Sequence, residues 1–193
     1  MVSKVPVWEG VHHVALVTSD MDATMRFWHE VLRAEIVATT STDAHRSYYF
    51  RVGETQTIAF MEYHGVDHAT SAKPPGTTYP SASPFDHLSL NLDDEASAWA
   101  LRARLIEYGY DVSDVVDRGL LRSIYFTDPT GIALEASWWT IDLDAGSLDD
   151  PERFQDPDPV PAFVELKMTG KIFASPRTAG VAGAEREPSP SRP

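Results

Sequence analysis

The sequence predicts an α+β protein built from two copies of one βαβββ module, and three observations lead to this prediction. Short stretches alternate apolar and polar residues with the two-residue period of a strand, and two longer stretches have helical spacing. The order strand, helix and three strands occurs twice. A segment rich in Pro, Gly and Ser, "SAKPPGTTYPSASP", separates the two copies. Because there are only two copies, the pattern indicates a duplicated module and not a solenoid.

The first module is expected over residues 10–65. A β-branched apolar run over residues 11–18 suits a strand, and Ser19 or Asp20 then caps a helix whose apolar residues recur at helical spacing. Three strands follow, and a "GE" turn separates the last two. Their sequences are "EIVATT", "RSYYFRVG" and "QTIAFMEY".

A linker over residues 66–84 leads to the second module, which is expected over residues 85–139. The strand "FDHLSLNL" alternates strictly, and the helix "DDEASAWALRARLIEYG" ends at Gly109. The last three strands are "YDVSDVVD", "LRSIYFTD" and "IALEASWW". Residues 140–193 form an extension rich in Pro and Asp, and its end has almost no large apolar residue. We expect a surface wrap followed by a disordered tail.

Composition restricts the partners that we expect. The formal net charge of −13 argues against a nucleic-acid surface, because phosphate is bound by clustered Lys and Arg. The chain has no cysteine, so a bound metal ion must be held by nitrogen and oxygen atoms. No run of residues is long and apolar enough for a membrane span, and the first residues lack the apolar segment of a signal peptide. We therefore expect a cytoplasmic protein with a small-molecule substrate and no membrane partner.

Strand alternation selects three candidate metal ligands. His13, His87 and Glu135 are all expected on the side of their sheets that faces away from the helices. Two imidazoles and one carboxylate suit divalent Fe, Mn, Ni or Zn and leave open positions on the metal. The alternative for each histidine is an ordinary surface or core residue, and the alternative for Glu135 is a solvated edge residue.

Three stretches carry a resemblance to a known family. "HHVALVTSDMDATMRFW", "FDHLSLNL" and "RSIYFTDPTGIALEAS" resemble the vicinal-oxygen-chelate superfamily, which includes glyoxalase I, bleomycin-binding proteins, fosfomycin-resistance enzymes and extradiol dioxygenases. The resemblance covers about residues 10–139. It implies that paired modules form a curled mixed sheet around a metal-centred cavity. It also implies that His13, His87 and Glu135 are the metal ligands.

The extradiol dioxygenase-like branch is the most similar in motif. The family signature has a Tyr ten residues before the ligand Glu, and Tyr125 stands at that distance from Glu135. The resemblance implies that Tyr125 is catalytic and hydrogen-bonds a metal-bound catecholate oxygen. The chain departs from the signature at Arg118, where the family has a substrate-binding His. The His that acts on bound oxygen also has no clear match, since His64 and His68 are offset.

Glyoxalase I-like members usually have a Glu as a fourth metal ligand. In this chain the first module would have to supply that residue. His87 and Glu135 are 48 residues apart, and a similar count from His13 ends near Phe60. Glu62 lies two residues further on the same face, so a shifted alignment would restore the fourth ligand.

These observations lead to one expected function and two alternatives. We expect a metal-dependent dioxygenase, with Fe(II) as the metal, that binds an aromatic or polyketide-like substrate through vicinal oxygens. The first alternative is a glyoxalase-like lyase or isomerase, for which Glu62 is the candidate base. The second is a protein that sequesters a small molecule, as the bleomycin binders do. Homodimerisation is a further expectation.

Overall fold

The structure is a computed structural model of the whole chain. It divides into two compact units, Met1–Trp138 and Trp139–Pro193. Apart from Val66, the expected linker lies outside the described residues, and so does the end of the expected tail. The described residues are 10–66, 85–141, 143, 150–151 and 153–170.

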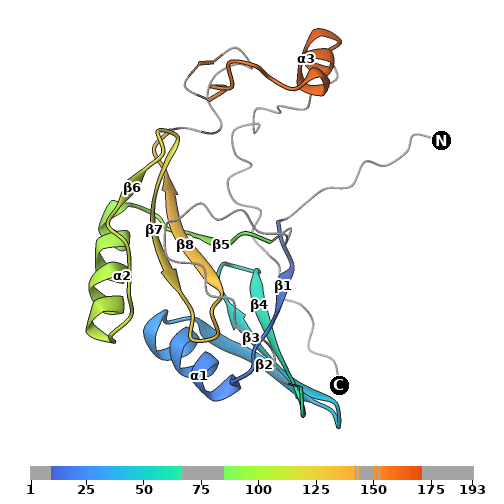
Figure 1. Cartoon of the computed structure of the whole chain (residues 1–193), viewed down its shortest axis with the longest axis vertical. Coiled ribbons are helices and arrows are strands. Elements are labelled where there is room, and N and C mark those ends of the chain that lie inside the picture. Colours follow the sequence, from blue (N-terminus) through green and yellow to red (C-terminus); the bar gives the residue numbers. More distant parts are fainter. Residues whose placement is uncertain (1–9, 67–84, 142, 144–149, 152, 171–193) are drawn as a thin grey trace, which may run out of the picture. The chain divides into compact units, whose positions relative to one another are not determined.

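The first module forms one four-stranded mixed sheet with a helix after its first strand (Figure 1). The strand order is β1-β4-β3-β2, in which β1 is parallel to β4 and the other pairs are antiparallel. Its elements are β1 (His13–Val17), α1 (Met21–Met25), the π-helix η1 (Arg26–Val31), β2 (Glu35–Ser41), β3 (His45–Arg51) and β4 (Thr57–Tyr63).

The second module repeats this arrangement. Its sheet has the order β5-β8-β7-β6, and β5 is parallel to β8. The predicted α+β fold of two βαβββ modules is confirmed, since both sheets place the first and last strands of the module side by side. The elements are β5 (Leu88–Asn91), α2 (Glu95–Glu107), β6 (Val116–Asp117), β7 (Leu121–Thr127) and β8 (Ala133–Trp139).

Both modules begin their helices with an aspartate cap. Asp20 accepts a hydrogen bond from the Ala23 N–H, and Asp94 accepts one from the Ser97 N–H. A carboxylate at this position satisfies an N–H that has no partner within the helix. The expected cap of the first helix is therefore Asp20 and not Ser19.

The sixth strand is shorter than the sequence predicts. The expected strand begins at Tyr110, but β6 begins at Val116, and only an isolated bridge between Val112 and Phe126 precedes it. Side chains occupy the hydrogen-bonding groups that a longer ladder would use. The Ser113 carbonyl accepts from Arg102, and the Tyr125 N–H donates to the Ser113 hydroxyl.

One apolar core includes residues of both modules. Phe27 of η1 contacts Tyr110 and Phe126 of the second module, with ring centroids 4.7 Å and 6.3 Å apart. Arg104 of α2 donates to the Val31 carbonyl at 2.7 Å. Trp99 of α2, by contrast, is 47% exposed. These contacts join the two modules through the helix side of their sheets.

The extension contains one further described helix. α3 (Pro161–Met168) begins with a proline in its first turn, where the missing N–H costs no hydrogen bond. Phe163 contacts the ring of Phe154 at 5.8 Å between centroids. Across the residues that the structure describes, no helix is both long and apolar enough to cross a membrane.

Candidate functional site

The first strands of the two modules each expose one face. In β1 the exposed side chains are those of His13, Ala15 and Val17, and in β5 they are those of Ser89 and Asn91. The intervening residues are half-buried, as expected for a strand with one face toward the core. The alternation of side chains therefore predicted the exposed face of these two strands correctly. This exposed face of each sheet is termed the open face.

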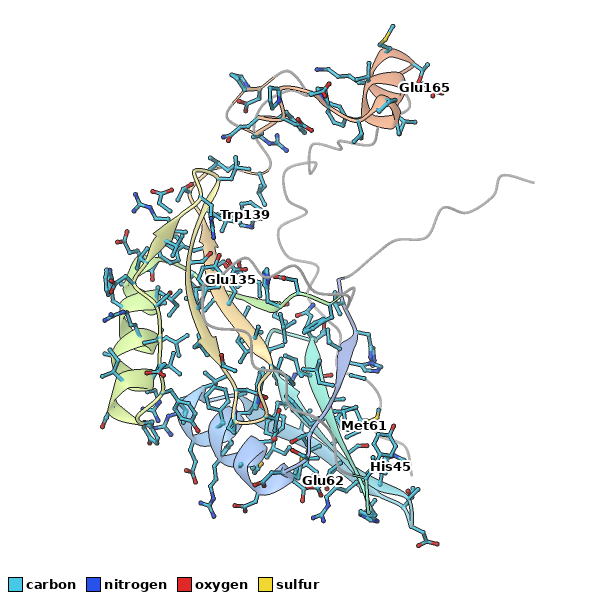
Figure 2. The ribbon with its side chains drawn as sticks, in the orientation of Figure 1. His45, Met61, Glu62, Glu135, Trp139 and Glu165 are labelled. Atoms are coloured by element: carbon cyan, nitrogen blue, oxygen red, sulfur yellow. The ribbon has the colours of Figure 1, made fainter. Side chains whose placement is uncertain are left out.

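On the open face of the second module, a histidine and a glutamate meet. His87 Nε2 lies 2.9 Å from Glu135 Oε2, and His87 Nδ1 lies 2.6 Å from Asp86 Oδ2. Glu135 is on β8 (Figure 2) and is only 6% exposed. The alternative of a solvated edge residue is therefore excluded for Glu135.

Hydroxyl groups surround the Glu135 carboxylate. Burial raises the pKa of this carboxyl, but hydrogen bonds from Ser123, Tyr125 and Ser89 and the nearby His87 ring outweigh the burial and hold the pKa below its ordinary value. The carboxylate is therefore ionised and able to accept hydrogen bonds or bind a cation.

A fourth hydroxyl links two of these groups. Ser137 Oγ lies 2.9 Å from Ser89 Oγ and 3.0 Å from Ser123 Oγ. In each of these two pairs either hydroxyl can be the donor, and Ser137, which has a single proton, donates to only one of them at a time. Strand alternation is consistent with Ser89 and Ser137 on this face, since each is two residues from His87 or Glu135, whereas Ser123 is a site residue that the sequence predictions missed.

Tyr125 of β7 belongs to the same group of side chains. Its ring lies edge-on to the His87 ring, with centroids 6.4 Å apart, and Tyr125 is one of the groups that lower the pKa of Glu135. Arg118 lies in the turn between β6 and β7, where its N–H donates to the Leu121 carbonyl.

The first-module histidine contacts its own neighbour, and among the described residues it forms no hydrogen bond with the group around Glu135. His13 Nδ1 lies 2.8 Å from His12 Nδ1, and both rings are exposed. Among the described residues, no group of three or more His, Asp or Glu side chains stands ready to hold a metal ion. His87, Glu135 and Tyr125 are thus brought together, and the participation of His13 stays a prediction.

Strand register identifies the first-module counterpart of Glu135. Ser89 is two residues after His87 and pairs with Glu135, and Ala15 is two residues after His13 and pairs with Ala59. Ala59 therefore occupies the position equivalent to Glu135.

The expectation that Phe60 occupies that position is wrong. Phe60 pairs with Leu16, is fully buried, and packs 5.2 Å from the Trp28 ring between centroids. The count from His13 is one residue too long. A shift of one residue along a strand moves a side chain to the opposite face of the sheet.

Glu62 also lies on the core side of the sheet, near α1 (Figure 2). Its Oε1 accepts from the Met21 N–H at 2.9 Å, and its Oε2 pairs with Arg46 Nε at 2.7 Å. Glu62 thus accepts a hydrogen bond at the start of α1 and forms an ion pair with Arg46. Because it lies on the side opposite the open face, it is not a fourth metal ligand.

One signal in the sequence identifies Ala59 without a structure. The first module contains "RSYYF" and the second contains "RSIYF". Aligning these motifs makes Ser47 and Tyr49 the counterparts of Ser123 and Tyr125. Ala59 follows Ser47 at the same distance at which Glu135 follows Ser123. In the structure Tyr49 pairs with Ala59, which agrees with this alignment.

A family model described as "Glyoxalase/Bleomycin resistance protein/Dioxygenase superfamily" matches residues 10–136. The chain belongs to this superfamily. The match includes both modules up to Ala136, so the superfamily assignment rests on the duplicated unit and on the strands that carry His87, Tyr125 and Glu135. No curated protein matches the chain.

Solved structures of the superfamily share the fold. A glyoxylase/bleomycin resistance protein/dioxygenase domain from Frankia sp. EAN1pec is 22% identical, with 69% of this chain and 93% of that chain covered and a TM-score of 0.59. A lactoylglutathione lyase from Agrobacterium tumefaciens is 21% identical, with 70% and 96% covered and a TM-score of 0.51. An antibiotic binding protein from Streptomyces sp. CB03234 is 18% identical, with 70% and 100% covered and a TM-score of 0.52. The superfamily fold thus occurs in both a lyase and a binding protein, so function must be argued from the site.

Proposed function

We propose that the chain is a metal-dependent, dioxygenase-type enzyme that binds a small aromatic or polyketide-like molecule through two neighbouring oxygen atoms. The observation that carries the proposal is the pair formed by His87 and the buried Glu135. An ionised carboxylate in a mostly buried position is costly unless it is paired or bound to a cation. Nearby hydroxyls and the His87 ring outweigh the effect of burial and keep the pKa of Glu135 below its ordinary value.

The donor atoms of this pair fit a divalent metal. His87 Nε2 and Glu135 Oε2 lie 2.9 Å apart, so one cation is able to contact both atoms. With His13 as third ligand, the set has two imidazole nitrogens and one carboxylate, which suits Fe(II) and is also compatible with Mn, Ni or Zn.

Each residue has a distinct task in the proposed reaction. A bound metal ion supplies Lewis acidity, which lowers the pKa of a catechol-like hydroxyl, and the redox chemistry needed for oxygenation. Glu135 supplies negative charge at the site, and His87 supplies a neutral nitrogen donor. The Tyr125 hydroxyl, which lies beside both, donates a hydrogen bond to the anionic oxygen of the substrate.

The environment of Glu62 favours the dioxygenase over the glyoxalase-like lyase. A lyase needs a base near the metal ion, and Glu62 is engaged with Arg46 and the start of α1. The position equivalent to Glu135 in the first module is Ala59, which supplies neither a ligand nor a base.

Oxygen uptake tests the proposed function. The purified full chain is loaded with Fe(II) without oxygen and then mixed with a panel of catechols and oxygen. We expect oxygen consumption that requires both metal and substrate. Substrate conversion without oxygen consumption would instead support the lyase, and tight ligand binding without conversion would support a sequestering protein. Absence of metal binding would exclude both enzymes.

Replacing Tyr125 with Phe is expected to reduce kcat/KM for oxygen uptake by roughly 10-fold to 100-fold, since hydrogen bonds to charged groups contribute about 1.5–3 kcal/mol. Tyr49→Phe is the matched control, because Tyr49 is the counterpart in the first module and pairs with Ala59. Initial rates and metal content are measured for both variants. Equal losses in the two variants would remove Tyr125 from the reaction.

A further inference from the structure

Each module places a hydrogen-bonding side chain directly before its proposed histidine ligand. In the second module, Asp86 Oδ2 lies 2.6 Å from His87 Nδ1. In the first module, His12 Nδ1 lies 2.8 Å from His13 Nδ1. His12 and Asp86 are equivalent positions of the repeat, so the contact itself is repeated although the residue type differs.

We propose that His12 and Asp86 are positioning residues that direct the Nε2 atoms of His13 and His87 toward the metal centre. This inference rests on the proposed function. A ring nitrogen engaged by a neighbour is no longer a ligand, and the opposite nitrogen is then the one left to bind. In the second module this opposite nitrogen is the atom that faces Glu135 at 2.9 Å.

The two positioning residues are chemically unequal. A carboxylate oxygen accepts hydrogen bonds, so in the contact with Asp86 it is His87 Nδ1 that donates, and Nε2 is left as the ligating atom. A histidine ring nitrogen either accepts or donates, so His12 Nδ1 fixes no single role for His13 Nδ1. When His12 donates, the proton of His13 moves to Nε2 and blocks that nitrogen. The first module therefore holds its histidine in the ligating tautomer less strictly than the second.

This inequality predicts opposite effects at equivalent positions. His12→Asp copies the arrangement of the second module and commits His13 to the ligating tautomer, so it is expected to tighten metal binding by about 10-fold. Asp86→Ala removes the acceptor from His87 and is expected to weaken metal binding by about 10-fold to 100-fold, as outer partners of metal ligands do. Asp86→Asn keeps a neutral acceptor and is expected to restore part of the affinity.

The test measures Co(II) affinity of the full chain by calorimetry, together with the Co(II) absorption spectrum. Nitrogen-15 NMR of the histidine rings, recorded without metal, reports which ring nitrogen carries the proton. Asp111→Ala is the control, because Asp111 is an exposed aspartate of the same module. We expect the affinity order His12→Asp, wild type, Asp86→Asn, Asp86→Ala, with Asp111→Ala equal to wild type and a shifted His87 tautomer in Asp86→Ala.

Two results would overturn the inference, and they are distinguishable from each other. If the wild-type chain binds Co(II) but Asp86→Ala and His12→Asp bind it equally well with unchanged ring tautomers, the positioning role is wrong and the metal centre stands. If the wild-type chain binds neither Co(II) nor Fe(II), the proposed function fails and the positioning role fails with it.

Discussion

Replacing Glu135 with Gln is expected to lower metal affinity by more than about 100-fold, since even the outer partners of metal ligands contribute about 10-fold to 100-fold. The amide that replaces the carboxylate has no charge and presents N–H groups where the metal ion needs an oxygen. Glu135 is 6% exposed and is the carboxylate that pairs with His87 Nε2, so its replacement removes the negative charge beside the proposed ligating nitrogen. Calorimetric titration of the metal-free chain with Fe(II) under anaerobic conditions, or with Co(II), measures the loss.

Glu62→Gln is the matched control for this experiment. Both substitutions remove one carboxylate charge from a last strand, but Glu62 points toward α1 and pairs with Arg46. Its replacement is expected to change metal affinity by less than about twofold, as for independent sites. A loss in Glu62→Gln as large as that in Glu135→Gln would contradict the register assignment, because it would place Glu62 at the metal.

Replacing Phe60 with Ala is expected to lower the free energy of unfolding by about 3–5 kcal/mol, the usual cost of removing a buried aromatic ring. Phe60 is fully buried and packs against Trp28 and Phe50, with centroids 5.2 Å and 6.0 Å away. The two surrounding rings belong to a helix and to a neighbouring strand, so they do not collapse easily into the space left behind. Urea unfolding of the metal-free chain, followed by tryptophan fluorescence and circular dichroism, measures the change.

Trp99→Ala serves as the comparison for Phe60→Ala. Trp99 is 47% exposed and lies 5.8 Å from the Arg102 guanidinium, a cation–π contact typically contributing about 0.5–1 kcal/mol at exposed sites. We expect a loss of this smaller size. If Phe60→Ala cost no more than Trp99→Ala, Phe60 would not be a core residue and the assignment of faces on β4 would be wrong.

Much of the candidate site follows from short-range patterns. Side chains on a strand alternate between faces, so the positions of His13, His87 and Glu135 on the open side follow from their immediate neighbours. The same alternation puts Ser89 on that side, where the structure has it. Tyr125 follows from a motif of fixed length, and in the structure its ring lies edge-on to the His87 ring, with centroids 6.4 Å apart.

The first-module residue equivalent to Glu135, where a fourth metal ligand would stand, did not follow from a short-range pattern. β1 and β4 are parallel neighbours whose connection contains a helix and two further strands. A count along the chain depends on the length of every intervening turn, and an error of one residue exchanges Phe60 for Ala59. The repeated "RSxYF" motif avoids most of this distance because it begins only one strand away.

The sequence by itself determined the fold class, the duplicated module and the face of each candidate side chain, because strand period, helix caps and motif repeats are local properties. Only the tertiary structure decided that Ala59 stands opposite Ala15, that Glu62 caps α1, and that Asp86 and His12 engage the two histidines. These features depend on strand register and on side-chain rotamers. Register is set by how strands that are distant in the sequence pair, and rotamers are set by the hydrogen bonds that neighbouring side chains form.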